Sequence, residues 1–343
     1  MIYPPKPKPG DRVAIVSPSG GLPELFPAVY ELGLSRLRET LDLEPVEYPT
    51  TRVVASTPRE RAQDLHAAFA DAGVAAVMAT IGGDDQITMR RHLDPEVLRT
   101  NPKPFFGFSD NTNLLNYLWD LGIVGYHGGS VMFHLGRGGR PHPAHIRSLR
   151  AALFQSGWHR LDPPADWGDE SVDWNHPGLA QVEPRMWPHE GWTWVNADRV
   201  VEARAWGGNL EIISWLMQAG FVQPNEAYAG GVLFLETSEE MPAATEVYRM
   251  LRNMGERGLL GRFRALIMGR AKAWEREHPT TEEQKREYVA RQRDAVGRAM
   301  GQYNPDALVV YDVDFGHTDP QLIIPIGGDI RVDGPAREIH VRY

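Results

Sequence analysis

Short apolar runs alternate with amphipathic stretches between Asp11 and about Gly129. The apolar runs at 12–17, 74–81, 105–108 and 123–126 have the length of strands, whereas residues 22–41 carry apolar positions at helical spacing. Thr57-Pro58-Arg59-Glu60 has the sequence of a capping box with proline at the first helical position, so a helix should begin there and end at Gly73. Strands that alternate with helices predict an N-terminal α/β domain on a parallel sheet.

The pattern of strands and helices resumes after Val200. Strands are predicted at 231–237, 264–268 and 307–315, and helices at 242–254 and 280–300, the second behind a capping-box sequence from Thr280 to Glu283. The tail has short β-like runs separated by Gly-Gly-Asp and Asp-Gly-Pro turns. We therefore expect a C-terminal α+β domain with a β-rich end.

The stretch between the two halves has a different composition. Six of the ten tryptophans lie between Gln155 and Trp194, among prolines, aspartates and histidines, with no helical or strand period. Such aromatic side chains can form a ligand-facing loop or pack the seam between two domains. The expected organisation is an N-terminal domain at 1–155, a tryptophan-rich linker or substrate loop at 156–195, and a C-terminal domain at 196–343.

Composition narrows the classes of function. The formal net charge is −9, and no block of basic residues occurs, which argues against a nucleic-acid partner. No apolar stretch approaches the ~20 residues needed to span a bilayer, and the N-terminus lacks the pattern of a secretory signal, so a cytoplasmic protein is expected. The chain has no cysteine, which excludes disulfides, thiolate metal sites and cysteine nucleophiles.

Ser109 is the first candidate for chemistry. The apolar run Phe105-Phe106-Gly107-Phe108 leads into this serine and then into an amphipathic stretch from Thr112 to Asp120. A strand, a sharp turn and a helix around one serine have the shape of a nucleophile elbow, although Asn111 replaces the second glycine of G-x-S-x-G. The alternative is that Ser109 or Asp110 only caps a helix.

A glycine pair, Gly82-Gly83, follows the second predicted strand. Paired glycines let the backbone approach a ligand closely and can present a free N–H to an oxyanion. An ordinary strand-to-helix turn is the alternative. Asp84 and Asp85 argue against a phosphate cradle, because carboxylates repel phosphate.

Glu236 and His317 end two predicted strands of the second half. A histidine in a glycine-containing turn at a strand end can act as a general base, and a carboxylate that ends an apolar strand needs a partner. No second ligand cluster accompanies the aspartates near His317, so no metal is expected. Ser109, Glu236 and His317 could form a catalytic triad, but only the fold could bring them together.

These segments together resemble one family. Residues 9–20, Ile81-Gly82-Gly83, Gly107-Phe108-Ser109-Asp110, Trp206-Gly207-Gly208-Asn209-Leu210, Leu235-Glu236 and Asp314-Phe315-Gly316-His317 are similar, in this order, to the serine LD-carboxypeptidases. The resemblance implies that Ser109 is the nucleophile, His317 the general base and acid, and Glu236 the carboxylate that orients the histidine. It also implies an oxyanion hole formed by the backbone N–H groups of Gly83 and Asp110, no cofactor, and a cytoplasmic homodimer.

Within that family the chain looks like the microcin C self-immunity branch. The segment Trp167 to Trp174 is similar to a loop in which an aromatic ring stacks on the nucleotide base of the substrate, which makes Trp174 the stacking candidate, and Asn209 is a further candidate for substrate contact. The resemblance thus implies a peptidyl- or aminoacyl-nucleotide substrate. A murein tetrapeptide with an L-D linkage is the alternative substrate.

Two readings from other classes remain open. A two-domain binding protein would use the cleft without a nucleophile, and a glycoside hydrolase would use a carboxylate pair such as Asp84 and Glu236.

Overall fold

The computed structural model describes residues 1–343 and divides their strands mainly between two sheets. The N-terminal sheet has the order β14-β5-β4-β3-β1-β2, in which five strands are parallel and β14 is antiparallel to β5. Its strands are β1 (Arg12–Val16), β2 (Glu44–Glu47), β3 (Ala76–Ala79), β4 (Phe105–Gly107), β5 (Gly125–His127) and β14 (Ile324–Ile326). The parallel α/β character predicted for the first half is therefore confirmed, with one strand contributed by the end of the chain.

Helices connect the strands of this sheet, as a parallel arrangement requires. They are α1 (Pro27–Leu41), α2 (Pro58–Ala70), α3 (Gln86–Met89), α4 (Pro95–Thr100) and α5 (Thr112–Asp120). A sixth helix, α6 (Pro143–Phe154), follows β5 and leads to the other sheet. The predicted capping box at α2 is present, because the Thr57 hydroxyl accepts from Glu60 N while the Glu60 carboxylate accepts from Thr57 N. Helix α2 nevertheless ends at Ala70, three residues before Gly73.

The C-terminal sheet has eight strands in the order β6-β16-β15-β10-β11-β12-β13-β9. The four strands β10 to β13 are parallel, and antiparallel strands flank them on both sides. The bounds are β6 (Trp158–Leu161), β9 (Thr193–Val195), β10 (Val200–Asn209), β11 (Val232–Glu236), β12 (Ala265–Gly269), β13 (Leu308–Val313), β15 (Asp329–Asp333) and β16 (Glu338–Arg342). The β-rich end predicted for the chain is thus present, but part of it completes the other sheet.

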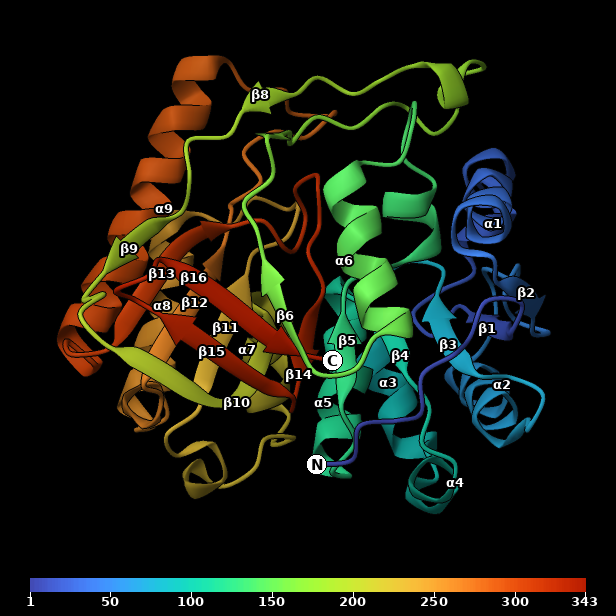
Figure 1. The fold of residues 1–343 in the computed structure, drawn as a ribbon, viewed down its shortest axis with the longest axis horizontal. Helices are drawn as coiled ribbons and strands as arrows, with labels where there is room; N and C mark the ends of the chain where they lie inside the picture. The colour runs from blue at the N-terminus through green and yellow to red at the C-terminus, as the bar shows by residue number, and fades with distance from the viewer.

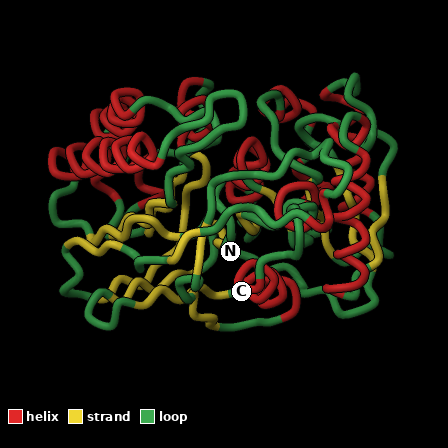
Figure 2. Tube along the Cα trace, turned by 90° about the horizontal axis from the view of Figure 1, so that it is seen from above, coloured by secondary structure: helices red, strands yellow, loops and turns green.

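Three helices accompany this sheet: α7 (Leu210–Gln218), α8 (Ala244–Glu256) and α9 (Glu282–Tyr303). The helices of this half gather on one side of its strands (Figure 2). The capping box of α9 uses Thr281 and Gln284, so the prediction of Thr280 and Glu283 was wrong by one residue. Thr280 instead donates its hydroxyl hydrogen to the Ala273 carbonyl.

The tryptophan-rich segment passes over the two halves at the top of Figure 1 and contains the short pair β7 (Asp166–Trp167) and β8 (Trp187–Pro188). The two sheets lie side by side below it, and both termini lie between them. A continuous core of 81 buried residues includes side chains from both halves. None of the helices has the length and apolar character required to cross a bilayer.

Candidate active site

Ser109 lies where β4 turns into the short helix η3 (Ser109–Asn111), directly before α5. Its φ angle is +59°, in the left-handed region that is unfavourable for a residue with a side chain, whereas Phe108 before it is extended. Such strained backbone persists only where the surroundings hold it, and it is typical of a nucleophile elbow. The predicted sequence of strand, sharp turn and helix around Ser109 is therefore found.

Buried amide side chains hold this turn in place. Asn111 Nδ2 donates to the carbonyl oxygens of Ile81 and Phe108, both at 3.0 Å, and Gln86 Nε2 donates to Asn111 Oδ1 at 2.9 Å. The backbone N–H of Gln86 donates to Asp110 Oδ2 at 2.9 Å. Asn111 thus has a structural use at the position where G-x-S-x-G has glycine, because its amide links the serine turn to the glycine loop.

The glycine pair lies against the serine. A methyl group on Gly82 would be 2.8 Å from Ser109 Cβ, 3.0 Å from Ser109 Oγ and 3.3 Å from the backbone nitrogen of Asp110. Gly83 has a φ of +156°, and its N–H donates no hydrogen bond within the chain. The Asp110 N–H lies at the start of η3, where helical N–H groups have no intrahelical partner. The backbone N–H groups of Gly83 and Asp110 are thus available as donors near the serine turn, and their role as an oxyanion hole stays a prediction.

The carboxylate of Glu236 and the imidazole of His317 form a short, buried contact. Glu236 ends β11 and is fully buried, and His317 follows β13 in the glycine-containing turn. His317 Nδ1 donates to Glu236 Oε2 at 2.6 Å, and the Phe108 ring packs 4.9 Å from the imidazole, centroid to centroid. The close packing explains the glycine of the motif, since a methyl group on Gly316 would lie 2.6 Å from Glu236 Oε2.

The other nitrogen of His317 is also engaged. His317 Nε2 lies 2.9 Å from Glu239 Oε2, while Ser109 makes no hydrogen bond to the imidazole. Burial by itself would lower the pKa of His317, but the charges and hydrogen bonds of Glu236 and Glu239 raise it to about 10. The sequence analysis did not predict a role for Glu239, although this residue lies only three positions after Glu236.

A second histidine, His127 on β5, lies on the far side of Glu236. His127 Nε2 is 3.9 Å from Glu236 Oε1, and neither ring nitrogen has a hydrogen-bond partner. Burial lowers its pKa to about 4, so the ring is neutral near pH 7. Nothing in the sequence distinguishes His127 from the other eleven histidines, and only the pairing of β5 with β4 brings it here.

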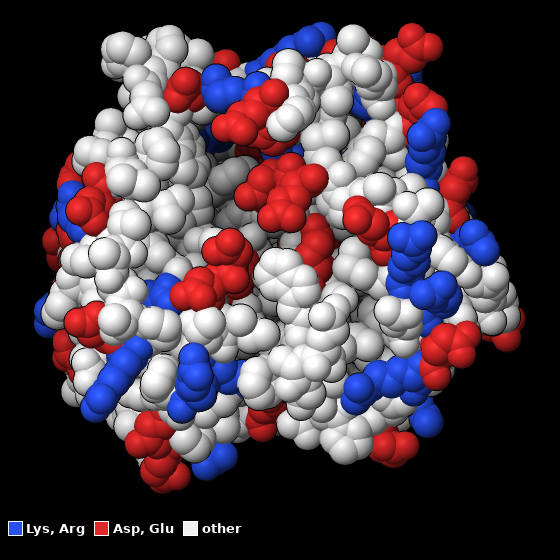
Figure 3. Space-filling view, turned by 180° about the vertical axis from the view of Figure 1, so that it is seen from behind, with Lys and Arg blue, Asp and Glu red and all other residues white.

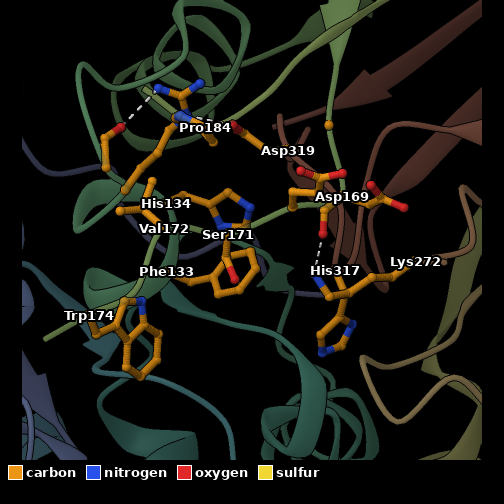
Figure 4. A pocket seen from close by; sticks show the side chains of 14 residues that line it. Phe133, His134, Asp169, Ser171, Val172, Trp174, Pro184, Lys272, His317 and Asp319 are labelled. Atoms are coloured by element: carbon orange, nitrogen blue, oxygen red, sulfur yellow. Dashed lines mark hydrogen bonds and ion pairs between the residues drawn. The ribbon is translucent and has the colours of Figure 1, made fainter. Parts of the chain in front are cut away.

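These groups open onto one cavity of about 310 Å³. Ser109, Gly83, Trp174, Glu239 and His317 all contribute to its wall, together with Leu22, Ile81, Gly82, Phe108, Phe133, Ser171, Lys272, Trp274, Glu275 and Arg276. Trp174 and His317 lie on opposite sides of the adjoining pocket, and Lys272 Nζ donates to the Asp169 carbonyl at 2.6 Å (Figure 4). No group of three or more His, Asp or Glu side chains is arranged to hold a metal ion.

Asn209 lies outside the wall of this cavity. It is buried at the end of β10, where its Oδ1 accepts from Ile212 N at 3.0 Å and caps α7. Gly208 before it allows close packing, because a methyl group there would lie 2.5 Å from Thr112 Cγ2. The Trp-Gly-Gly-Asn motif is thus explained by packing and capping, and substrate contact by Asn209 stays a prediction.

Comparisons with known proteins identify the family of this chain. The LD-carboxypeptidase N-terminal domain matches residues 13–128, and the LD-carboxypeptidase C-terminal domain matches residues 202–332. The chain belongs to the LD-carboxypeptidase family. Among curated relatives, the microcin C7 self-immunity protein MccF of Escherichia coli is 24% identical over 294 residues, which cover 84% of this chain and 79% of that protein.

Solved structures of this LD-carboxypeptidase family share the fold. An MccF-like protein from Streptococcus pneumoniae, solved in complex with AMP, has a TM-score of 0.84 at 22% identity, with 97% of this chain and 99% of that chain covered. MccF in complex with aspartyl sulfamoyl adenosine has a TM-score of 0.83 at 21% identity, with 100% of this chain and 99% of that chain covered. The mixed α/β class and the family predicted from the sequence are confirmed, and the chain is a serine-type peptidase.

Proposed function

We propose that this LD-carboxypeptidase family member hydrolyses an amide bond through a Ser109–His317–Glu236 triad and an acyl-Ser109 intermediate. The observation that carries the proposal is the 2.6 Å contact between His317 Nδ1 and the buried Glu236 Oε2, because His317 lines the same cavity as the strained Ser109 turn. With Nδ1 held by Glu236, Nε2 is the ring nitrogen that can exchange a proton with Ser109.

The reaction has two steps. His317 Nε2 takes the Ser109 proton while Oγ attacks the carbonyl carbon, and the N–H groups of Gly83 and Asp110 hold the oxyanion. His317 then gives the proton to the leaving nitrogen, so the amide bond breaks and the acyl group stays on Ser109. A water molecule, deprotonated by His317, attacks this ester and regenerates the serine.

The favoured substrate is an aminoacyl or peptidyl nucleotide. Trp174 and Trp274 line the cavity that contains Ser109, and an indole face can stack on a nucleotide base. Trp174 also packs edge-on against Phe26, with the ring centroids 5.2 Å apart, so its ring is held in place. The MccF complexes with AMP-like ligands support the same substrate class.

A murein tetrapeptide is the second candidate, because the family models are those of LD-carboxypeptidases. Its terminal carboxylate would need a cation near the serine, and the cavity offers Lys272 and Arg276. Both are already engaged: Lys272 donates to the Asp169 carbonyl, and Arg276 to the Ser171 carbonyl at 2.8 Å. The nucleotide is therefore the better match.

A side-by-side assay separates the two candidates. Purified protein is incubated with an aminoacyl-sulfamoyl adenosine and with a murein tetrapeptide, and both products are followed by chromatography. We expect turnover of the adenosine derivative alone. Turnover of the tetrapeptide alone would overturn the substrate assignment, and labelling of Ser109 by a fluorophosphonate would still report an activated serine. The homodimer and the cytoplasmic location remain predictions, and sedimentation analysis tests the first.

A further inference from the structure

The proton-accepting nitrogen of the catalytic base is already occupied in the free protein. His317 Nε2, which must take the proton of Ser109, lies 2.9 Å from Glu239 Oε2. A base needs a free lone pair on this nitrogen, whereas a carboxylate there favours the protonated ring. The raised pKa of His317, about 10, agrees with this reading. The geometry is that of a resting enzyme in which Glu239 must leave Nε2 before the first step.

Glu239 differs from Glu236 in how easily it can move. Glu236 is fully buried, whereas 54% of the Glu239 side-chain surface is exposed at the cavity that Ser109 also lines. Apart from its own backbone N–H, the Glu239 carboxylate has His317 as its hydrogen-bond partner. A Glu239 carboxylate that leaves the imidazole needs other donors in place of Nε2, which water or a bound substrate can supply.

Two cations of the chain line this cavity, and the charge of Lys272 acts on Glu239, but both already have partners. Lys272 donates to the Asp169 carbonyl, and Arg276 donates to the Ser171 carbonyl and lies 3.7 Å from Asp173. A donor supplied by the substrate could take the place of Nε2 at Glu239 without breaking these contacts. The face opposite to that of Figure 1 has a hollow with Asp and Glu side chains gathered along it (Figure 3), and the net charge of −9 also favours an incoming cation.

The position of the carboxylate limits where that cation can be. Glu239 Oε2 is within hydrogen-bond distance of Nε2, and Nε2 must reach both Ser109 Oγ and the leaving nitrogen during the reaction. A group that replaces Nε2 at Glu239 is therefore only a few bonds from the scissile carbonyl. The α-ammonium of an aminoacyl group, two bonds from its carbonyl carbon, meets this requirement, and a distant side-chain amine does not.

We propose that Glu239 is a specificity residue that binds the free α-ammonium of an aminoacyl donor and, by this exchange, releases His317 Nε2 to Ser109. The proposal rests on the hydrolytic function proposed above and narrows its substrate to donors with a free amine. A donor whose α-amine is acylated has no ammonium group to bind Glu239. Glu239 then stays at His317 Nε2, and such donors react slowly.

Several other charged or titratable groups act on this pair. They come from the elements packed around His317 and Glu239: Glu236 on β11, His127 on β5, His134 on the π-helical turn η4 (Val131–Leu135), and Lys272, Glu275 and Arg276 in the loop after β12. The variants below leave all of them in place, so a changed pH profile reports on Glu239.

The first test is a substrate pair. L-alanyl-sulfamoyl adenosine and its N-acetyl derivative are compared with the wild type, Glu239→Gln, and Glu240→Gln as the matched control, since Glu240 is the exposed neighbouring carboxylate and makes no contact with His317. We expect the wild type and Glu240→Gln to prefer the free amine by at least about 10-fold in kcat/KM, a difference of about 1.4 kcal/mol. Glu239→Gln should reduce that preference to about threefold or less. An undiminished preference in Glu239→Gln would overturn the proposal.

The second test needs no substrate. A fluorophosphonate, which has no ammonium group, is used to label Ser109 between pH 5 and 10. We expect Glu239→Gln to label faster than the wild type at pH 7 and to reach its half-maximal rate at least about one pH unit lower, because a carboxylate that favours protonated His317 is gone. Identical profiles would contradict the proposal while leaving the nucleophile intact, whereas no labelling of Ser109 in any variant would remove the hydrolytic function itself. Glu239→Ser serves as the second variant if Glu239→Gln does not fold.

Discussion

The two halves of the molecule bring the proposed catalytic groups to the cavity in different ways. The N-terminal half holds Ser109 on a strained turn fixed by neutral, buried hydrogen bonds from Asn111 and Gln86. The C-terminal half holds His317 between two carboxylates, one buried and one at the cavity wall. The difference indicates that the nucleophile is preset by the fold, whereas the base is controlled by charges that a substrate can rearrange.

The largest expected effect on turnover comes from removal of the Ser109 hydroxyl. Ser109→Ala should lower kcat by about 10⁴-fold or more, because no acyl-enzyme can form. The thermal midpoint of unfolding should not fall, because the substitution removes only the hydroxyl group. Steady-state kinetics and calorimetry measure both, and retained turnover would remove the nucleophile assignment.

Glu236→Gln tests the buried partner of the histidine. We expect kcat to fall about 10³- to 10⁴-fold, because a neutral amide no longer stabilises the imidazolium or fixes its Nδ1–H tautomer. The amide is nearly isosteric, so circular dichroism should show an unchanged fold. Unchanged turnover would mean that Glu236 is only structural.

Gly82→Ala tests how tightly the serine turn is set. The added methyl group would lie 2.8 Å from Ser109 Cβ, so the turn or the loop must shift, and we expect a loss in kcat of about 10²-fold. Gly20→Ala is the control, since a methyl group there meets only Leu22 Cδ1 at 3.7 Å. Equal activity of the two variants would contradict a preset nucleophile.

Trp174→Ala concerns binding rather than chemistry. Loss of a stacking surface worth about 1–3 kcal/mol should raise KM for an aminoacyl nucleotide by about 10-fold and leave kcat nearly unchanged. Trp158→Ala, at an exposed position on β6 away from the cavity wall, is the control. An unaltered KM would assign Trp174 to packing alone.

The smallest expected effect is on stability. Because the pKa of His317 is raised to about 10 in the fold, above about 6.5 in the unfolded chain, its contribution is complete below pH 6.5 and is lost as pH rises through 10. The free energy of unfolding from urea titrations should therefore decline over this range more steeply in the wild type than in Glu239→Gln. Parallel curves would show that Glu239 does not hold the proton on His317.

The sequence predicted the elements whose signals are local. The capping box at Thr57 located α2, and the apolar runs located β1, β4, β11 and β13 because buried parallel strands have nearly continuous hydrophobic sequences. The strand β10 was missed, since Gly207 and Gly208 interrupt its pattern for reasons of close packing against β11 and α5.

The parts of the site that depend on long-range contacts could not be predicted in the same way. Family motifs predicted a triad of Ser109, Glu236 and His317, but the contact of Glu239 with His317 follows from the direction of the chain after β11, which no local pattern encodes. His127 is near Glu236 only because β5 pairs with β4.

The strand β14, at residues 324–326, forms one edge of the sheet that bears Ser109. During synthesis, that sheet therefore lacks its edge strand until residues 324–326 have left the ribosome. A nascent chain that already contains Ser109 consequently cannot display a finished active centre, and splitting the gene between the two halves would separate the serine sheet from its last strand.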